Sequence, residues 1–366
     1  MMYNEDEKAL IYLSQYDFMT SAKFSQILEV FECPKDIITA NPNELSKIKD
    51  ALGNNFEIFL DGIAKYSSSN FFYELEKRNI NCLTIMSKNY PERLLNLKNP
   101  PYVLYYSGDI SLLNTKSIAI VGTRNPTSYG RIITERYAKE LAKNGVTIIS
   151  GLASGVDKIS HEGALEVGGK TIAVLGGGFD NIYPAMNINL AREIAKSGLI
   201  ITEYYVTIKP TKYTFPTRNR IIAGLSSAVL ITEAGDGSGS LYTKEHADEV
   251  GIDSYCVPGN ITSEKSFATN DLIKKGVAGC TTSPNDILVD LGININKKAK
   301  KEAKSSQEQL TIEETAIVSE LENGEHDFEY LQIKTGFSTQ ILNYNLTTLE
   351  IRGIIKKLAG NTYILC

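Results

Sequence analysis

The chain has 366 residues, a net charge of −5 and 42% hydrophobic residues, as soluble globular proteins do. Its length predicts two or three domains. No apolar run approaches the roughly 20 residues that cross a bilayer, and the acidic start has no apolar signal core, so we expect no membrane span and no secretion signal. Five scattered cysteines without a C-x-x-C pair fit the reducing cytoplasm and argue against disulfides or structural zinc.

Charge is unevenly distributed along the chain. Residues 1–65 hold 6 Lys/Arg against 11 Asp/Glu, whereas residues 112–292 hold 18 of each. Because no long stretch is basic, any polyanion has to be held by a local site.

The sequence predicts three domains and one linker. Residues 1–65 form a helical domain, because apolar residues recur there at helical spacing. Residues 66–292 form a central domain, and the polar, lysine-rich residues 293–310 form a linker. Residues 311–366 follow the order helix–helix–helix–hairpin of a winged helix, with a Gly-Asn turn signal at Gly360.

Short apolar runs alternate with helical stretches through most of the central domain. Because each run is almost wholly apolar, we expect strands covered on both faces, and hence an α/β fold with a doubly wound, mostly parallel sheet. Ligands of such sheets bind beyond the carboxyl ends of the strands, so the loops that follow the runs are candidate sites. The runs are Ser117–Val121, Val146–Ser150, Thr171–Leu175, Leu199–Thr202, Ala228–Thr232 and Ser254–Val257.

The segment Phe215–Ser226 is the most informative one, because it puts an aromatic ring, two guanidinium groups and an amide at the start of a predicted helix. Unpaired backbone N–H groups at that end of the helix, beside Arg218 and Arg220, favour an anion. Residues two apart on a helix point in different directions. We therefore expect one of the two arginines to pair with an acidic neighbour such as Glu203 or Glu233.

Loops rich in glycine follow several of the predicted strands. Glycine allows a tight turn and a close approach of phosphate to backbone N–H groups, although each loop alone could be an ordinary turn. After the fifth run, the backbone N–H groups of Ser238 and Gly239 also open a helix, whose positive end favours a phosphate. The predicted phosphate-cradling residues are Gly122, Thr123, Ser150, Gly151, Gly155, Gly176, Gly177, Ser238 and Gly239.

Asp157 and His161 are four residues apart on a predicted helix, so their side chains can meet. A metal or catalytic pair would need a third group, and the chain has only three histidines. We therefore expect these two residues to order the loop through a structural hydrogen bond, and we expect no metal site.

Known nucleotide-binding motifs do not fit the chain. The loop Gly176–Tyr183 has Asn181 where G-x-G-x-x-G needs glycine, and the Walker pattern is absent from the sequence. A dehydrogenase or an NTPase is therefore disfavoured, and we expect no cofactor.

Four or five loops at one sheet edge, together with Arg124, Arg218, Arg220 and Phe215, predict a groove for single-stranded DNA. A base that stacks on an aromatic ring gains about 1–3 kcal/mol whatever its identity. A flexible strand can also engage several loops in succession, which a stiff duplex cannot do as well.

Taken in order, these motifs resemble the DNA-processing protein A family (DprA, also called Smf). The likeness covers about half of the chain, and it is the ordered set of motifs that is specific. The motifs are Tyr90-Pro91, Pro100-Pro101, Gly122-Thr123-Arg124, Ser150–His161, Leu175–Pro184, Phe215–Ser226, Glu233–Leu241, Val257-Pro258-Gly259 and Asn270–Ile273.

The resemblance implies an extended Rossmann-like core that binds single-stranded DNA, forms a homodimer in the cytoplasm and helps to load the RecA recombinase during natural transformation. It also implies that Arg124, Arg218, Asn219 and Arg220 line the DNA pocket and that Phe215 is its stacking surface. We add Lys158, on the helix that follows the second loop, to the predicted DNA-binding residues.

The two terminal domains depart from a DNA-binding pattern. Family members often carry an N-terminal domain of the SAM or helix-hairpin-helix type, but the expected turn here, Asp17–Lys23, lacks glycine. The candidate recognition helix Ser338–Glu350 has no Lys or Arg. We therefore expect both domains to contact protein, and a fragment of residues 305–366 to leave DNA unshifted in a gel.

Two other functions compete with this hypothesis. The core also resembles phosphoribohydrolases, which release a base from a nucleoside monophosphate and need a glutamate at the ribose. Glu245 is the candidate for this glutamate. Hydrolysis of adenosine monophosphate by the protein would reveal such an activity. A structural scaffold is the other alternative. Loss of single-strand affinity in Arg124→Ala with the fold intact would exclude it.

Overall fold

The computed structural model describes residues 3–293 and 310–365. It divides into two compact units, Met1–Ile293 and Asn294–Cys366. The predicted linker, apart from its two end residues, lies outside the described residues. Among the helices that are described, none has both the length and the apolar character needed to cross a membrane.

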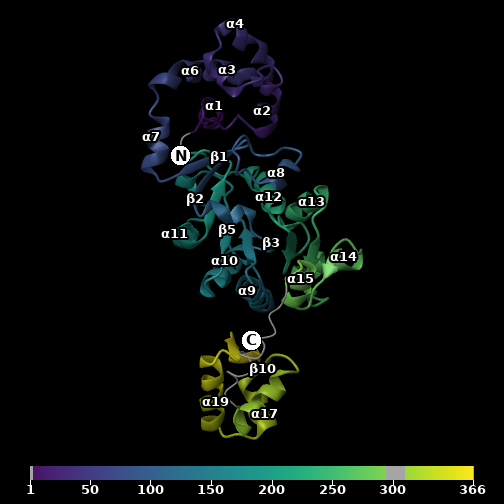
Figure 1. Cartoon of the computed structure of the whole chain (residues 1–366). Coiled ribbons are helices and arrows are strands. Elements are labelled where there is room, and N and C mark those ends of the chain that lie inside the picture. The colour runs from purple at the N-terminus through teal and green to yellow at the C-terminus, as the bar shows by residue number, and fades with distance from the viewer. Residues whose placement is uncertain (1–2, 294–309, 366) are drawn as a thin grey trace. The chain divides into compact units, whose positions relative to one another are not determined.

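A nine-stranded sheet forms the centre of the first unit (Figure 1). Its spatial order is β1-β2-β6-β5-β4-β3-β7-β8-β9. The strands from β6 to β9 run parallel, whereas β1 pairs with β2, and β2 with β6, in antiparallel fashion. The strands are β1 (Asn81–Thr84), β2 (Val103–Gly108), β3 (Ser117–Val121), β4 (Thr147–Ser150), β5 (Thr171–Val174), β6 (Leu199–Thr202), β7 (Ala228–Ile231), β8 (Ser254–Cys256) and β9 (Gly279–Cys280).

The mostly parallel α/β sheet is thus confirmed, and all six predicted strands are present to within one residue at each end. The antiparallel strands β1 and β2 were not predicted. Both lie in the segment that precedes the first apolar run. Their register places Tyr105 opposite Thr202, so β2 extends the sheet beyond β6.

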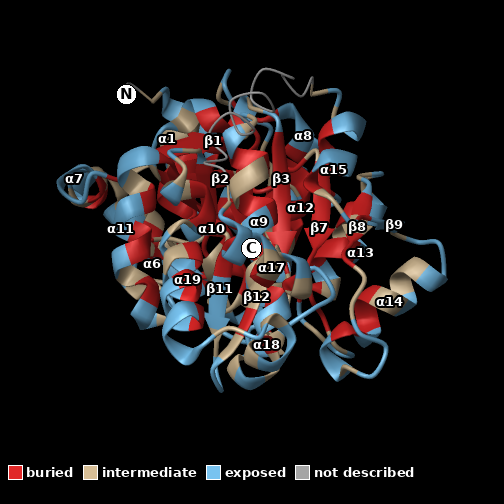
Figure 2. Ribbon diagram, turned by 90° about the horizontal axis from the view of Figure 1, so that it is seen from below, coloured by how far each residue is buried: buried red, intermediate tan, exposed pale blue. Residues whose placement is uncertain are grey.

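Helices cover both faces of the sheet, and Figure 2 shows the strands as the most continuously buried part of the chain. Successive strand residues point to opposite faces: Ile172 and Val174 share a core cluster with α12, whereas Ala173 belongs to a cluster with α11. The helices of this part are α8 (Glu92–Leu95), α9 (Ser128–Lys143), α10 (Val156–Glu166), α11 (Ile188–Ser197), α12 (Thr214–Leu225), α13 (Leu241–Glu249), α14 (Phe267–Lys274) and α15 (Pro284–Asp290).

Residues 5–77 are largely helical, but their helices share a core with the sheet. Val103 and Tyr105 of β2 lie in one buried cluster with residues of α1 and α2, and the Tyr105 hydroxyl is 2.6 Å from Ser14 Oγ. We predicted residues 1–65 as a separate domain; here they pack on the sheet edge within the same compact unit. The helices are α1 (Glu5–Leu13), α2 (Ser21–Leu28), α3 (Pro34–Thr39), α4 (Pro42–Leu45), α5 (Lys49–Leu52), α6 (Phe56–Lys65) and α7 (Phe71–Lys77).

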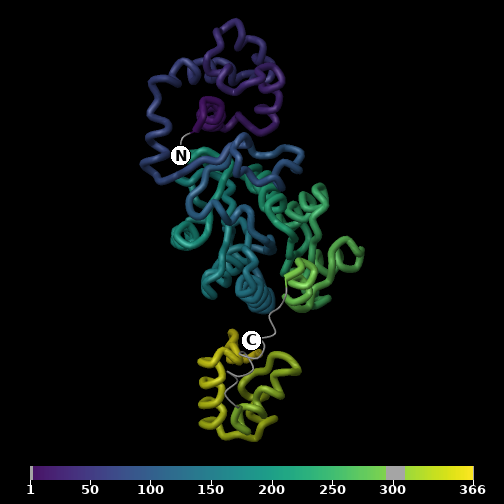
Figure 3. Tube along the Cα trace, viewed as in Figure 1, coloured from purple at the N-terminus to yellow at the C-terminus, as the bar shows by residue number. Residues whose placement is uncertain are grey.

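Residues 310–365 of the second unit form three helices and a three-stranded antiparallel sheet of order β10-β12-β11, whose path Figure 3 traces. The predicted Gly-Asn turn joins β11 to β12, and both of its residues have positive φ, as a tight hairpin turn requires. The elements are α17 (Ile312–Leu321), β10 (His326–Asp327), α18 (Phe328–Thr335), α19 (Thr339–Ile351), β11 (Ile355–Leu358) and β12 (Thr362–Leu365).

Candidate nucleic-acid interface

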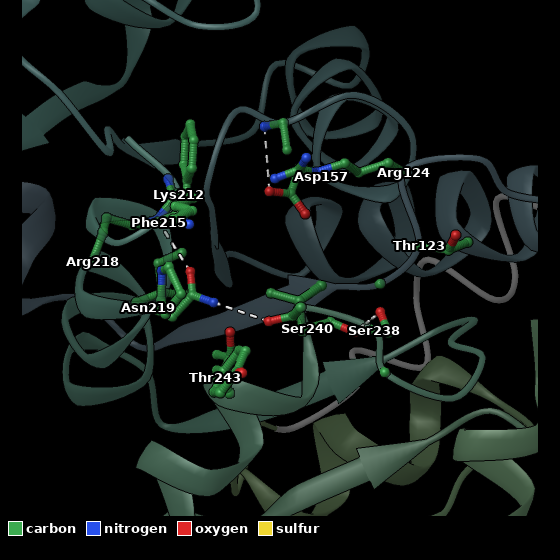
Figure 4. A pocket seen from close by; sticks show the side chains of 18 of the residues that line it. Thr123, Arg124, Asp157, Lys212, Phe215, Arg218, Asn219, Ser238, Ser240 and Thr243 are labelled. Carbon is green, nitrogen blue, oxygen red and sulfur yellow. Dashed lines mark hydrogen bonds between the residues drawn. The ribbon is translucent and has the colours of Figure 1, made fainter. Parts of the chain in front are cut away.

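A cavity of about 670 Å³ opens beyond the carboxyl ends of β3 and β7 (Figure 4). The chain order reverses at this point, since β4 to β6 lie on one side of β3 and β7 to β9 on the other. We call this cavity the switch-point pocket. Its wall combines the loops after β3 and β7 with the start of α12 and the loop before it, and α10 and the segment before α14 also contribute. The wall includes Thr123, Arg124, Asp157, Lys212, Phe215, Arg218, Asn219, Ser238, Gly239 and Lys265.

Arg124 and Phe215 form the aromatic and cationic part of this wall. The Arg124 guanidinium lies 5.6 Å from the centre of the Phe215 ring, within the range of a cation–π contact. The exposed ring of Tyr183 is 5.7 Å from the same ring. Sequence reasoning singled out Arg124 and Phe215, but it did not single out Tyr183, although this tyrosine closes one of the glycine-rich loops.

The Phe215 ring occupies space that Gly176 leaves open because it has no side chain. A Cβ atom on Gly176 would lie 2.7 Å from the ring, closer than carbon atoms can approach. Gly176 therefore gives space to a side chain of the protein, and it does not line the pocket. The predicted role of Gly176 in cradling phosphate finds no support in this arrangement.

Arg218 lines the switch-point pocket but is almost entirely buried, with 4% of its surface exposed. One of its Nη atoms donates to the carbonyls of Gly151, at 2.6 Å, and Val174, and its Nε donates to Asn219 at 3.1 Å. Burial lowers the pKa of Arg218 to about 10, so it remains a cation at neutral pH. The positive charge of Arg218 therefore contributes to the electrostatic potential of the pocket, while most of its N–H groups donate to other groups of the protein.

Arg220 does not line the switch-point pocket, contrary to our expectation. Its Nη2 donates to Glu203 at 2.6 Å and to Ser21 Oγ at 3.3 Å. The position two residues after Arg218 turns Arg220 away from the cavity, as helix geometry requires. The ion pair that we predicted for one of the two arginines is therefore present, and Glu203 is the partner.

Asn219 connects α12 with the loop after β7. Its Nδ2 atom donates to the carbonyl of Gly239 at 3.2 Å, and Ser238 Oγ is 2.8 Å from Ser240 Oγ (Figure 4). Nothing lies within 4 Å of a Cβ built on Gly239, so its backbone faces open space. Ser238 and Gly239 thus lie on the pocket wall, where a phosphate could reach them.

The other predicted cradling residues divide into two groups. Gly122 and Thr123 line the pocket. The loop that begins with them is ordered by the buried Glu233, whose carboxylate accepts hydrogen bonds from the N–H of Thr127 at 2.8 Å and from the Thr127 hydroxyl at 2.6 Å. Thr127 also caps α9, because its side chain accepts from the N–H of Gly130. Ser150, Gly151, Gly155 and Gly177 lie outside the wall, because each packs against backbone or side chains of its own chain.

Asp157 orders its loop as predicted, but without His161. The Asp157 carboxylate accepts from the N–H groups of Gly151 at 3.1 Å and Ala153 at 3.3 Å. Burial raises the pKa of Asp157, and the nearby Arg218 opposes that rise. His161 instead places Nδ1 2.6 Å from Thr171 Oγ1, so the expected pairing of Asp157 with His161 is replaced by two separate contacts.

His161 should make the protein sensitive to mild acid. Burial lowers the pKa of His161 to about 3 from 6.5, so the unfolded chain binds the extra proton between these values. Stability from this group is complete above pH 6.5 and falls as the pH decreases towards 3, by about 2 kcal/mol at pH 5. We expect His161→Gln to remove this part of the decrease in the free energy of unfolding with falling pH, measured by urea unfolding between pH 8 and pH 5. An unchanged pH dependence in the variant would show that His161 is not the cause.

Lys158 is not a wall residue. It lies on α10, half-exposed, with Nζ 3.5 Å from Glu162. The cations that do line the pocket besides the arginines are Lys212 and Lys265, both exposed. Sequence reasoning missed them because they belong to loops without a motif, although Lys212 precedes Phe215 by only three residues.

The glutamate that the phosphoribohydrolase hypothesis requires lies outside the switch-point pocket. Glu245, the candidate for a phosphoribohydrolase, is exposed on α13 and is not part of the pocket wall. Within residues 3–293 and 310–365, no group of three or more His, Cys, Asp or Glu side chains is arranged to hold a metal ion.

Comparison with known proteins gives a consistent result. Residues 81–292 match the family model described as DNA recombination-mediator protein A. The DNA processing protein DprA of Bacillus subtilis is 39% identical over 66% of this chain and 80% of its own length. DprA of Streptococcus pneumoniae is 36% identical over 72% of this chain and 92% of its own length.

Two solved structures share the fold. The X-ray structure of DprA from Streptococcus pneumoniae superposes with a TM-score of 0.67 at 33% identity, covering 81% of this chain and all of that one. A Helicobacter pylori DprA structure, described in terms of its single-stranded DNA binding mode, gives a TM-score of 0.53 at 38% identity over 58% of this chain and 95% of that one. The chain therefore belongs to the DNA recombination-mediator protein A family, whose members include DprA and Smf.

Proposed function

We propose that this protein binds single-stranded DNA in the switch-point pocket, without catalysing a reaction. The observation that carries the proposal is the charge of the wall: four cationic side chains, those of Arg124, Lys212, Arg218 and Lys265, against the two carboxylates of Asp157 and Asp236. In a protein of net charge −5, this local excess of positive charge would attract a polyanion such as DNA.

The Phe215 ring supports single-stranded over duplex DNA. Base stacking on an aromatic side chain needs an unpaired base, and Phe215 and Tyr183 offer adjoining rings beside the cations. The family membership and the single-stranded DNA binding mode described for the Helicobacter pylori protein agree with this assignment.

Fluorescence anisotropy with oligo-dT and with a duplex of the same length tests the proposal. We expect tighter binding of the single strand and an affinity that falls steeply with salt, because each phosphate held by a cation contributes about −0.7 to the slope of log K against log salt. Equal affinity for both forms, or no salt dependence, would refute the proposal.

We propose further that the protein acts in the cytoplasm as a homodimer that protects incoming single strands and helps to load RecA on them during natural transformation. This part rests on the family alone, since RecA and a second copy are macromolecular partners that the pocket itself does not identify.

The C-terminal unit is proposed to be a winged-helix-like domain that contacts protein. Helix α19, in the place of a recognition helix, carries no Lys or Arg, and it exposes Tyr344 by 72% and Ile351 by 82%. These two residues are seven apart and hence on one helix face. An apolar face without cations suits a protein surface better than a DNA groove.

A further inference from the structure

A second cavity, of about 460 Å³, lies between the N-terminal helices and α12. Its lining comes from α2 and the segment before it, from residues 99–103 at the start of β2, from the loop after β6, and from α12 and α13. Pro216 and Tyr242 line both this cavity and the switch-point pocket. The two cavities therefore share a rim.

The lining of the second cavity is aromatic and carries no excess of positive charge. Its acidic side chains are Asp17 and Glu203 and its basic ones are Arg220 and His246, so the lining has no excess of basic groups. It therefore lacks the positive charge that would attract a phosphate, in contrast to the switch-point pocket. The rings in the lining instead suit a flat, uncharged group, and they belong to Tyr16, Phe24, Tyr102, Tyr204 and Tyr242.

Arg220 and Glu203 are part of this lining and are only partly satisfied. Their ion pair uses Nη2 and Oε2, whereas Arg220 Nη1 and Glu203 Oε1 are buried without a hydrogen-bond partner among the described residues. The pair thus holds one spare donor beside one spare acceptor. The edges of DNA bases present the complementary arrangement, an acceptor next to a donor, as adenine does with N7 and the N6 amino group.

We propose that the second cavity receives one base of the strand whose backbone lies in the switch-point pocket, with the base held by the aromatic lining and by the spare groups of the Arg220–Glu203 pair. This inference rests on the proposed single-stranded DNA binding. It gives the N-terminal helices a direct part in that binding, although they carry a net negative charge.

The test is to fill the cavity from its outer wall. Ala22 lines it from the second position of α2 and is exposed, so Ala22→Phe adds a ring without disturbing a core. We expect Ala22→Phe to weaken oligo-dT binding about five-fold or more, the lower end of the effect of one stacked base. Ala22→Ser, which adds no ring, should bind as the wild type does.

A second readout uses oligo-dT that carries 2-aminopurine, whose fluorescence is quenched when it stacks. Quenching at saturating protein should decrease in Ala22→Phe and in Tyr204→Leu, which removes one wall of the cavity. Thermal unfolding of each variant shows that the fold is kept. If wild-type protein fails to bind oligo-dT, the proposed function falls; if the wild type binds and Ala22→Phe matches it in affinity and quenching, the second cavity alone is excluded.

Discussion

Replacing Arg124 by alanine is expected to weaken oligo-dT binding about ten-fold, as the loss of one charge-assisted contact to phosphate would. Arg124 is exposed on the wall of the switch-point pocket and is free of ion pairs shorter than 4 Å to described residues. Its charge is therefore available to DNA, unlike that of the buried Arg218. The slope of log K against log salt should become shallower by about 0.7.

The matched control is Lys158→Ala, which removes the same charge from the same domain but outside the pocket. We expect less than a two-fold change from it, within the small effects typical of distant surface charges at physiological salt. Arg124→Lys keeps the charge but loses the flat contact with Phe215, so it should restore the salt slope and only part of the affinity. If Lys158→Ala weakens binding as much as Arg124→Ala does, the pocket is not the principal site.

Phe215→Ala separates stacking from charge at the same place. The loss of a stacked base costs about 1–3 kcal/mol and should reduce the affinity equally at every salt concentration. Since Arg124 lies over the Phe215 ring, the two substitutions share a contact, and their effects should not add.

The central sheet could be predicted because parallel strands that are buried on both faces appear in the sequence as short, almost wholly apolar runs. Few other secondary-structure elements produce such runs. Strands β1 and β2 could not be predicted in this way. The partner of β2 in the sheet, β6, lies far along the chain. The β2 sequence itself, Val103–Gly108, follows shortly after two prolines and ends in Ser-Gly, which are not typical of a strand. That one of the two arginines would pair with an acidic neighbour followed from helix geometry, because residues two positions apart point in different directions. Only the structure identifies the pair as Arg220 and Glu203.

The glycine loops show the limit of sequence reasoning about the site. Glycine signals that something approaches the backbone closely, but not what it is. At Gly176 and Gly151 the approaching groups are the side chains of Phe215 and Arg218, which come from a distant helix. The cations of Lys212 and Lys265 were missed for a related reason: only the tertiary fold brings these two loops to one wall.

Replacing Gly151 by alanine is expected to destabilise the protein by about 3 kcal/mol. A Cβ atom at Gly151 would lie 2.6 Å from Arg218 Cζ and would push the guanidinium away from the carbonyls of Gly151 and Val174. Each hydrogen bond of a buried charged group contributes about 1.5–3 kcal/mol. Backbone strain plays no part, because the φ angle of Gly151 is not in the left-handed region. Urea unfolding at pH 7.5 measures the loss.

Gly239→Ala is the control for this substitution, because a Cβ there meets no atom within 4 Å and its φ is also outside the left-handed region. Its effect on stability should stay within about 0.5 kcal/mol. A double-mutant cycle then identifies the cause: in an Arg218→Met background, the flexible apolar chain can yield, so the cost of Gly151→Ala should fall to less than half. An equal cost in both backgrounds would mean that Gly151 is required by its own loop and not by Arg218.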